Sequence, residues 1–343
     1  MRTADYDYAL PPERIAQAPV EPRDHARLLV VERGTGRLSH HRFRDLPELL
    51  RAGDLLVAND SRVMPARLRG RKVPGGGRIE LLLLRPSDET TWLGLIRGAV
   101  KVGTRIRIEG GSGASPTGEV VGVEADGTRR VRFDTPIEPD LPRLGEVPLP
   151  PYIRQPLADG ERYQTVYARV SGSAAAPTAG LHFTPDLIAR LATAGIPLAF
   201  VTLHVGLDTF RPVQVERIED HPLHREWGDL PPATADLVKA TRAAGHRVVA
   251  VGTTAVRVLE TGADHGGSEP SVVPFAGWTD LFITPGHRFR AVDALITNFH
   301  LPRSTLLLLV AAFAGKELLD RAYATAMAGE YRFYSFGDAM LVL

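Results

Sequence analysis

Apolar segments of four to six residues, each running into polar residues, recur along this chain and constrain its fold more than any other feature. The segments that read as buried strands are 54–58, 198–203, 247–251 and 294–297. Helical patterns at 185–194 and 233–244 lie among them. Strands that alternate with helices of this length are typical of a layered α/β domain with a largely parallel sheet.

The region between the first of these strands and the others has a different texture. Short β-rich runs cut by glycine occur at 79–84, 91–96, 104–108, 119–123 and 130–133. Such spacing indicates a small antiparallel β-barrel. The sequence therefore predicts a discontinuous α/β domain over 1–62 and 149–343, interrupted by an inserted barrel over 63–148.

Composition narrows the class of protein. A length of 343 residues fits two domains, and the absence of cysteine excludes disulfides, thiol nucleophiles and Cys-ligated metal centres. The N-terminus lacks an apolar signal segment, and the longest apolar run, 306–314, is far shorter than the roughly 20 residues that span a bilayer. We expect a cytoplasmic protein without a membrane role.

Polar residues follow all four predicted parallel strands. They include Asn59, Asp60 and Ser61 after the first strand, His204 and Gly206 after the second, Thr253 and Thr254 after the third, and Asn298 and His300 after the fourth. In open α/β sheets, ligands bind beyond the carboxyl ends of the strands. A single histidine in such a place is more often structural, but the set together predicts one shared site.

The third strand end also opens a helical pattern. Gly252-Thr253-Thr254 precedes it, and a threonine N-cap with free backbone N–H groups can hold an anion or a carboxylate. An ordinary helix cap is the alternative that the sequence leaves open.

Several common sites are absent from the sequence. There is no P-loop pattern and no G-x-G-x-x-G after a strand, which argues against a P-loop NTPase and a dinucleotide site. His221 and His224 are three residues apart with Pro222 between them, which disfavours a helical metal site. We expect no bound metal.

The charge distribution is uneven. Residues 62–110 hold 11 Lys and Arg against 4 Asp and Glu, whereas the rest of the chain holds 30 against 36. The run without an acid comprises Arg62, Arg67, Arg69, Arg71 and Lys72. Such side chains make most phosphate contacts to nucleic acids, so they are candidate RNA-binding residues. A solvated edge strand is the alternative.

Longer motifs are more specific. They lie at 59–68, 163–168, 175–184, 203–206, 209–213, 252–254, 298–302, 331–333 and 337–340. In these motifs, along nearly its whole length, the chain resembles the S-adenosylmethionine:tRNA ribosyltransferase-isomerases of queuosine synthesis. The resemblance also implies an α/β domain that carries an inserted β-barrel.

The resemblance implies an activity and its partners. The ribosyl part of S-adenosylmethionine is transferred to 7-aminomethyl-7-deazaguanine at the wobble position of a tRNA with a GUN anticodon. Isomerisation of the ribose gives epoxyqueuosine-tRNA, adenine and methionine. S-adenosylmethionine is then a co-substrate, no cofactor is bound permanently, and the chain is expected to act as a monomer.

This chemistry suggests roles for the strand-end residues. The sulfonium acidifies the adjacent ribose 5′ carbon, so a base with a pKa near ambient pH is needed, which favours histidine. The candidate bases and acids are His182, His204 and His300, with Asp60 orienting a hydroxyl or an imidazole. The candidate S-adenosylmethionine-binding residues are Thr178, Gly180, Gly206, Thr253, Thr254 and Asn298, the threonine pair holding the methionine carboxylate.

The sequence departs from the family pattern at a few positions. Asp208 stands where a small residue is expected, Ala255 where serine is usual, and Arg225 and 228–229 alter another motif. These departures leave two alternatives open. One is a paralogue with a different nucleoside acceptor, and the other is a non-catalytic RNA-binding protein on the same fold.

Overall fold

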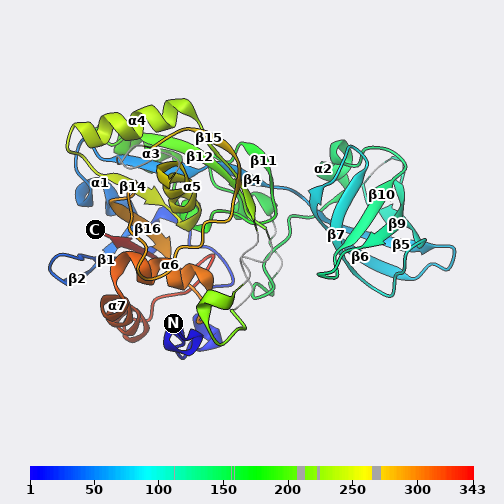
Figure 1. Ribbon diagram of the computed structural model, residues 1–343, viewed down its shortest axis with the longest axis horizontal. Helices are drawn as coiled ribbons and strands as arrows, with labels where there is room; N and C mark the ends of the chain where they lie inside the picture. The colour runs from blue at the N-terminus through cyan, green and yellow to red at the C-terminus, as the bar shows by residue number, and fades with distance from the viewer. Residues whose placement is uncertain (112, 156, 158, 207–212, 222–224, 265–271) are drawn as a thin grey trace. The chain divides into compact units, whose positions relative to one another are not determined.

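The computed structural model describes residues 1–343 except 112, 156, 158, 207–212, 222–224 and 265–271 (Figure 1). The chain divides into two compact units. The α/β unit comprises Met1–Arg62, Pro151–Val170 and Ala176–Leu343, and the barrel unit comprises Val63–Pro150 and Ser171–Ala175.

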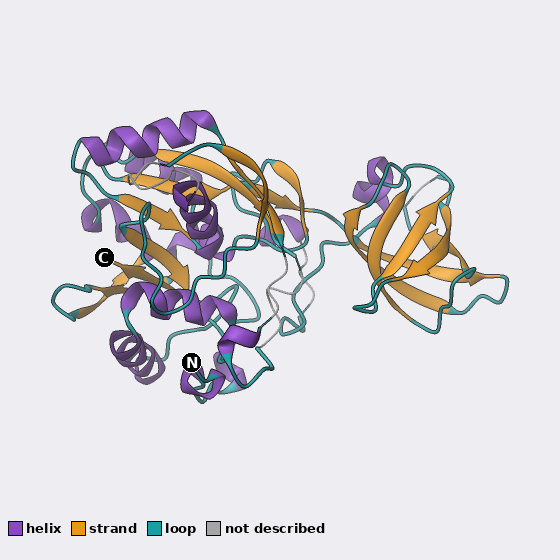
Figure 2. Ribbon diagram, viewed as in Figure 1, coloured by secondary structure: helices purple, strands orange, loops and turns teal. Residues whose placement is uncertain are grey.

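The α/β unit is built on a nine-stranded sheet of order β15-β13-β12-β3-β14-β16-β17-β1-β2 (Figure 2). Its strands are β1 (Arg27–Val31), β2 (Leu38–Arg42), β3 (Leu55–Asn59), β12 (Leu198–His204), β13 (Glu226–Leu230), β14 (Val248–Val251), β15 (Phe275–Thr279), β16 (Ala294–Asn298) and β17 (Ala339–Val342). The central strands β12, β3, β14 and β16 are mutually parallel. This confirms the predicted fold class, with a parallel centre of the sheet.

The edges of the sheet differ from its centre. β13 and β15 continue it by antiparallel pairing on one side, and β2 pairs antiparallel with β1 on the other. The sequence analysis did not identify these edge strands. They carry mixed polar and apolar residues, unlike the wholly buried β3, β14 and β16, whose apolar runs reflect coverage of both faces.

Helices cover both faces of the sheet. On one face lie α1 (Leu46–Leu49), the 3₁₀ turn η7 (Thr178–His182) and α3 (Pro185–Thr193), and on the other lie α4 (Pro232–Ala243), α5 (Thr253–Asp264), α6 (Thr305–Ala314) and α7 (Lys316–Ala328). The other 3₁₀ turns of the described residues are η1 (Thr3–Tyr6), η2 (Pro12–Arg14), η3 (Arg23–His25), η4 (Phe43–Asp45), η5 (Glu138–Asp140), η6 (Gly160–Tyr163) and η9 (Ile218–Asp220). We call the face of the sheet that α1, η7 and α3 cover the α3 face, and the face that α4, α5, α6 and α7 cover the α5 face.

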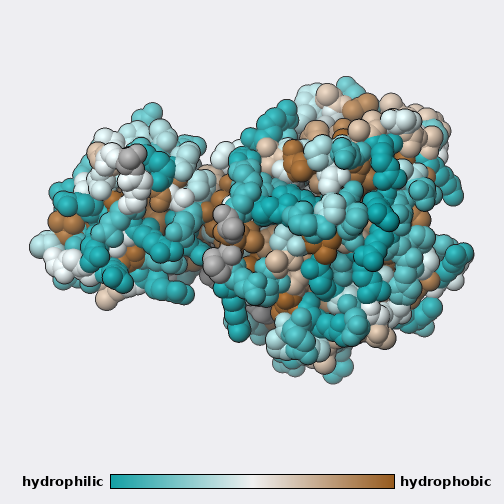
Figure 3. Space-filling view, turned by 180° about the vertical axis from the view of Figure 1, so that it is seen from behind, coloured by the Kyte–Doolittle hydropathy of each residue, from teal (hydrophilic) through white to brown (hydrophobic). Residues whose placement is uncertain are grey.

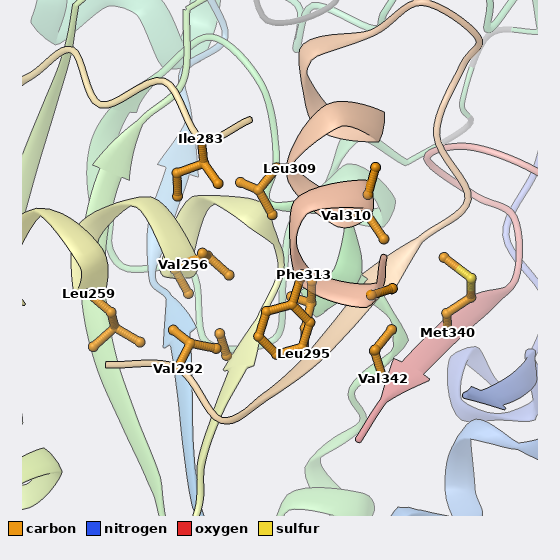
Figure 4. Packing of buried hydrophobic residues seen from close by; sticks show 14 of the residues in the cluster. Val256, Leu259, Ile283, Val292, Leu295, Leu309, Val310, Phe313, Met340 and Val342 are labelled. Atoms are coloured by element: carbon orange, nitrogen blue, oxygen red, sulfur yellow. The ribbon is translucent and has the colours of Figure 1, made fainter. Parts of the chain in front are cut away.

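Alternation along each strand separates the two cores. On the α5 face, Leu295 and Val342 of the sheet pack against Val256 and Phe313 (Figure 4). Ile296, the next residue of β16, packs in the core on the α3 face. Because successive side chains of a strand point to opposite faces, the residue number decides which core each side chain enters.

Local signals explain where the helices begin. Thr184 accepts a hydrogen bond from the Leu187 N–H at 3.1 Å, with Pro185 at the first helical position of α3. Ser304 caps α6 in the same way, accepting from the Leu307 N–H. No helix within the described ranges is both long and apolar enough to cross a membrane.

The barrel unit is a closed antiparallel barrel of order β10-β7-β6-β5-β8-β9. Its strands are β5 (Arg67–Val73), β6 (Arg78–Pro86), β7 (Thr91–Arg97), β8 (Arg105–Glu109), β9 (Thr117–Val123) and β10 (Arg129–Phe133), and the short helix α2 (Leu141–Leu144) follows them. Two short strands, β4 (Ser61–Val63) and β11 (Val170–Ser173), pair with each other as a separate sheet.

Inward residues of the barrel alternate with outward ones. Leu81, Trp92, Ile106 and Val131 fill the interior, and hydrophilic residues cover much of the outer surface (Figure 3). Closure pairs the strand edges, so the barrel presents no open strand edge. Gly145 is required at the exit of α2, because a Cβ there would lie 1.6 Å from the Pro65 carbonyl oxygen.

Candidate active site

The carboxyl ends of β12, β3, β14 and β16 lie side by side at one edge of the sheet. The strand order therefore places His204, Asp60, Thr253 and Asn298 at the ends of four neighbouring strands, as the sequence analysis predicts. We refer to the polar residues at these ends as the strand-end cluster. Their individual contacts decide which of them are available for chemistry.

Asp60 is the best-anchored carboxylate of the cluster. Its side chain is 2% exposed, and its two oxygens accept hydrogen bonds from the Thr202 hydroxyl at 2.7 Å and from Arg169 at 2.8 Å. The Arg169 side chain is itself 73% exposed, so the ion pair reaches the surface. Asn59, by contrast, bridges β3 to the Leu203 backbone of β12, which is a structural role.

His204 lies at the end of β12, half-buried and stacked on the Trp227 ring with centroids 5.5 Å apart. Burial lowers the pKa of its imidazole, and the negative charge of Asp60 opposes that shift. Its Nδ1 atom is buried and has no hydrogen-bond partner among the described residues. A neutral imidazole with an unoccupied ring nitrogen beside a carboxylate can take up a proton.

His182 is held in a closed network on the α3 face. Its Nε2 lies 3.3 Å from the amide nitrogen of Asn298, whose side-chain oxygen accepts a hydrogen bond from Thr178 at 2.9 Å. The ring packs 4.9 Å from that of Phe43. Burial lowers the pKa of His182 to about 4, and the positive charge of Arg332 acts in the same direction. This imidazole is neutral at pH 7 and already engaged.

His300 does not join the other two histidines. Its Nε2 lies 2.7 Å from the Thr297 hydroxyl, and Thr297 has the strand parity of Leu295, which faces the α5-face core. Asn298, the next residue, has the opposite parity and contacts His182. Burial lowers the pKa of His300 to about 3. The expected trio of imidazoles is thus divided between the two faces of the sheet.

The N-terminus of α5 differs in detail from the expectation. The helix begins at Thr253, so Gly252, with φ of +86°, occupies the preceding position that the sequence analysis gave to threonine. The first N–H groups of a helix lack partners within it and carry partial positive charge. Ala255, the departure from the family pattern, is fully buried in the α5-face core.

The two candidate glycines have different explanations. A Cβ on Gly180 would lie 2.1 Å from the Tyr167 hydroxyl oxygen, so close packing against that ring requires glycine there. At Gly206 no atom of the described residues lies within 4 Å of an added Cβ, and its backbone N–H donates to the Glu226 carboxylate at 3.0 Å. Asp208 and His224 lie outside the described residues.

Sequence reasoning missed a buried ion pair beside the cluster. Arg257 of α5 forms a salt bridge with Glu226 of β13, and both side chains are almost completely buried. Arg257 also donates to the Leu281 carbonyl at 3.2 Å. The signal in the sequence was Arg257, a charged residue in the otherwise uncharged first two turns of α5. The pair connects the segment after β12 to the helix that follows β14.

Several buried polar atoms of the cluster and of the neighbouring segment 165–167 have no partner among the described residues. They are Ser61 Oγ, Thr165 Oγ1, Tyr167 Oη, His204 Nδ1 and Thr254 Oγ1. Buried polar atoms in folded proteins are nearly always hydrogen-bonded, so such a group of orphans indicates a polar ligand or ordered water. The parts of the chain that the structure describes contain no group of three or more metal-ligating side chains.

Four of the five predicted RNA-binding cations pair with acids from elsewhere in the sequence. In the barrel unit, Arg67 lies 4.0 Å from Glu80, Arg69 pairs with Glu146 at 3.0 Å and Arg71 pairs with Glu109 at 2.7 Å; Lys72 donates to the Ala99 carbonyl at 3.2 Å. In the α/β unit, Arg62 pairs with Glu161. The run that contains no acid in sequence is therefore largely neutralised in the fold.

Comparison with known proteins covers the whole chain. A family described as queuosine biosynthesis protein matches residues 3–342. The S-adenosylmethionine:tRNA ribosyltransferase-isomerases of Symbiobacterium thermophilum and Moorella thermoacetica are 55% and 54% identical to it, each over 100% of both chains. The crystal structure of S-adenosylmethionine tRNA ribosyltransferase from Thermotoga maritima is 41% identical, with a TM-score of 0.57, and the match covers 99% of this chain and 100% of that one.

Proposed function

Because this chain belongs to the queuosine biosynthesis family of S-adenosylmethionine:tRNA ribosyltransferase-isomerases, we propose that the strand-end cluster is its catalytic site. The enzyme transfers the ribosyl part of S-adenosylmethionine to tRNA and isomerises it in queuosine biosynthesis. The products are epoxyqueuosine-tRNA, adenine and methionine. The roles of individual residues follow from their contacts.

The α5 N-terminus binds the methionine carboxylate of S-adenosylmethionine. The backbone N–H groups at Thr253 and Thr254 point away from the helix and favour a negative charge. Thr254 Oγ1, buried and without a partner among the described residues, supplies a further hydrogen bond. No atom of the described part of the chain lies within 4 Å of a Cβ added at Gly206, which lets a ligand approach the backbone there.

His204 is the general base. The sulfonium makes the ribose 5′ carbon acidic, and transfer of a 5′ proton to His204 leaves an ylide on the substrate. Burial keeps the imidazole neutral before the transfer, and the Asp60 carboxylate stabilises the imidazolium after it. Expulsion of adenine, attack by the amine of the modified base and epoxide closure with loss of methionine complete the reaction.

His182 and Asn298 act as positioning residues. The His182 ring orients the Asn298 amide, and Thr178 fixes the other end of that amide. Gly180 lets the Tyr167 hydroxyl approach the same region. His300 has a structural role, because its imidazole is buried against Thr297 on the α5 face.

The acceptor is a tRNA with a GUN anticodon that carries 7-aminomethyl-7-deazaguanine, whose primary amine is the nucleophile. To contribute to tRNA binding, Arg62, Arg67, Arg69, Arg71 and Lys72 exchange the partners that they have in the fold for phosphates. S-adenosylmethionine is bound only during turnover, no cofactor or metal is held permanently, and the chain acts as a cytoplasmic monomer.

The polar atoms at the strand ends that lack a described partner carry this assignment, since they can hydrogen-bond to a polar ligand at the place where α/β sheets bind one. The test is adenine release from labelled S-adenosylmethionine by the purified protein. We expect release with tRNA that bears the aminomethyl-deazaguanine and none with unmodified tRNA. Release that requires another tRNA nucleoside would indicate a changed acceptor, and no release with any tRNA would reject the catalytic assignment.

A further inference from the structure

Two neighbouring rows of outward side chains on the barrel differ in charge pattern: one alternates in sign, and the other is entirely positive. In the first row, Glu109, Arg69, Glu80 and Arg97 lie directly opposite one another on β8, β5, β6 and β7, so the signs alternate. Favourable pairing of opposite charges across strands is the usual arrangement on an exposed sheet surface. This row needs no external partner.

The adjacent row contains only arginines. Arg107 of β8 lies opposite Arg71 of β5, which in turn lies opposite Arg78 of β6. All three are exposed. Like charges directly opposite each other destabilise a sheet, so the cross-strand neighbours within this row repel one another. We call these three residues the arginine row.

The arginine row is only partly compensated. Arg71 pairs diagonally with Glu109 of the alternating row. Within the described ranges, neither Arg78 nor Arg107 lies within 4 Å of a carboxylate oxygen, whereas Arg67, Arg69, Arg105 and Arg130 of the same barrel do. Arg105, two residues before Arg107 on the same face of β8, pairs with Asp134 at 3.0 Å.

We propose that the arginine row binds the phosphate backbone of the tRNA substrate, an inference that rests on the tRNA-modifying function proposed above. Guanidinium groups bind phosphate through two parallel hydrogen bonds, and they do so better than ammonium groups. Neighbouring strands are about 4.8 Å apart, so the row spans roughly 10 Å and can face more than one phosphate of a strand. A polyanion relieves the repulsion that the barrel itself leaves uncompensated.

The phosphate backbone fits this row better than a base-reading surface does. Phosphate contacts set affinity and position without reading sequence, and they require exposed cations rather than a shaped pocket. Arg78 and Arg107 meet that requirement and were not among the residues that the sequence singled out. The row therefore contributes to binding of tRNA in general, and recognition of the modified base belongs to the α/β unit.

The experiment uses the full chain and an Arg78→Gln/Arg107→Gln double variant. Affinity for an unmodified tRNA transcript is measured over a range of salt concentrations, beside KM and kcat for adenine release. We expect the double variant to bind tRNA about tenfold more weakly near 0.1 M salt, with a log–log salt slope smaller by roughly 1.4 to 2. KM for S-adenosylmethionine and kcat at saturating tRNA stay at wild-type values.

Arg105→Gln is the matched control, because it removes a cation of the same strand face that already has a carboxylate partner. It should change the tRNA affinity less than twofold. An Arg78→Lys/Arg107→Lys variant, which keeps the charge, should restore the salt slope. Equal loss in the Arg105→Gln control, or an unchanged slope in the double variant, would overturn the proposal.

Failure of this proposal is distinguishable from failure of the proposed function. If the wild-type chain releases adenine in a tRNA-dependent manner and the double variant behaves identically, only the arginine row is wrong. If the wild type binds tRNA with a slope that the double variant reduces but no tRNA supports adenine release, the row stands and the catalytic assignment falls.

Discussion

The α/β unit and the barrel unit use the same kind of element, the β-strand, for opposite purposes. In the α/β unit, polar side chains gather at the ends of buried parallel strands, where several have no hydrogen-bond partner among the described residues. In the barrel, polar side chains alternate along the strands, face outward and mostly pair with one another. The difference teaches that burial, rather than residue type, decides which polar groups are left available to bind a ligand.

The physical reason lies in how each sheet is covered. Helices enclose both faces of the parallel sheet, so polar groups can reach a ligand only at the strand ends. The barrel fills its interior with apolar side chains and leaves its whole outer surface to water. Burial lowers the pKa of His182, His204 and His300 in the first unit. The barrel segment 63–150 contains no histidine.

The largest expected effect tests whether catalysis belongs to the α/β unit alone. His204→Asn removes the proposed base, and we expect kcat for adenine release to fall by about 100- to 10,000-fold. The control is His246→Asn, an exposed histidine of the same unit, which should retain wild-type turnover. Turnover within tenfold of wild type in His204→Asn would show that another group takes the proton.

The next test compares a buried ion pair with an exposed one. Glu226→Ala leaves Arg257 buried without its carboxylate, and we expect the free energy of unfolding to fall by about 3–5 kcal/mol. In the barrel, Glu124→Ala breaks the exposed pair with Arg130 and should change it by less than about 1 kcal/mol. Denaturant unfolding measures both, and equal losses would remove burial as the explanation.

Acid stability should also come from the α/β unit. The folded pKa of His300 is about 3, below the ordinary value of about 6.5, so the unfolded state binds this proton more tightly between those pH values. Stability is therefore highest above pH 6.5 and is lost as the pH falls toward 3. Between pH 7 and pH 5 we expect His300 to account for a loss of roughly 2 kcal/mol in the free energy of unfolding.

The measurement is denaturant unfolding at pH 7 and pH 5. In His300→Gln the pH-dependent loss should shrink by that amount, whatever the variant's stability at pH 7. In His246→Gln, which changes an exposed histidine, it should remain. An undiminished pH dependence in His300→Gln would contradict the assignment.

A smaller effect separates ligand-binding hydroxyls from structural ones on the same helix. Thr254→Val removes a buried hydroxyl that has no partner among the described residues, so stability should be unchanged or higher, while the Kd for S-adenosylmethionine rises about fivefold. Thr261→Val removes a hydroxyl bonded to Thr279 and to the Arg257 carbonyl. That variant should lose stability and keep its affinity, as calorimetric titration and thermal unfolding would show.

The smallest effect is expected on the barrel surface. Arg69→Gln breaks the exposed pair with Glu146 and should lower the free energy of unfolding by less than about 1 kcal/mol, with the difference shrinking as salt is raised. Adenine release at saturating tRNA should be unaffected. A large loss of stability would mean that the outer charges of the barrel are structural after all.

Much of the fold and part of the site could be predicted from the sequence. The apolar strands β3, β12, β14 and β16 are recognisable because each lies between two covered faces and has few polar residues. Asp60 and His204 lie at the carboxyl ends of two of these strands, so the sequence predicts them as candidate site residues. The edge strands were not predicted, because the polar residues at their outer positions resemble those of loops.

What the sequence determined by itself is local: the alternation of strands and helices, the glycine-punctuated barrel, and the polar residues that follow each strand. Only the tertiary structure decided which strands are neighbours, that His300 points to the opposite face from Asn298, that Glu226 meets Arg257, and that Arg107, Arg71 and Arg78 share a row. The reason is that spacing along a strand fixes the face of a side chain relative to its neighbours in sequence. Its partners depend on strand order and register, which are set by packing between segments distant in the chain.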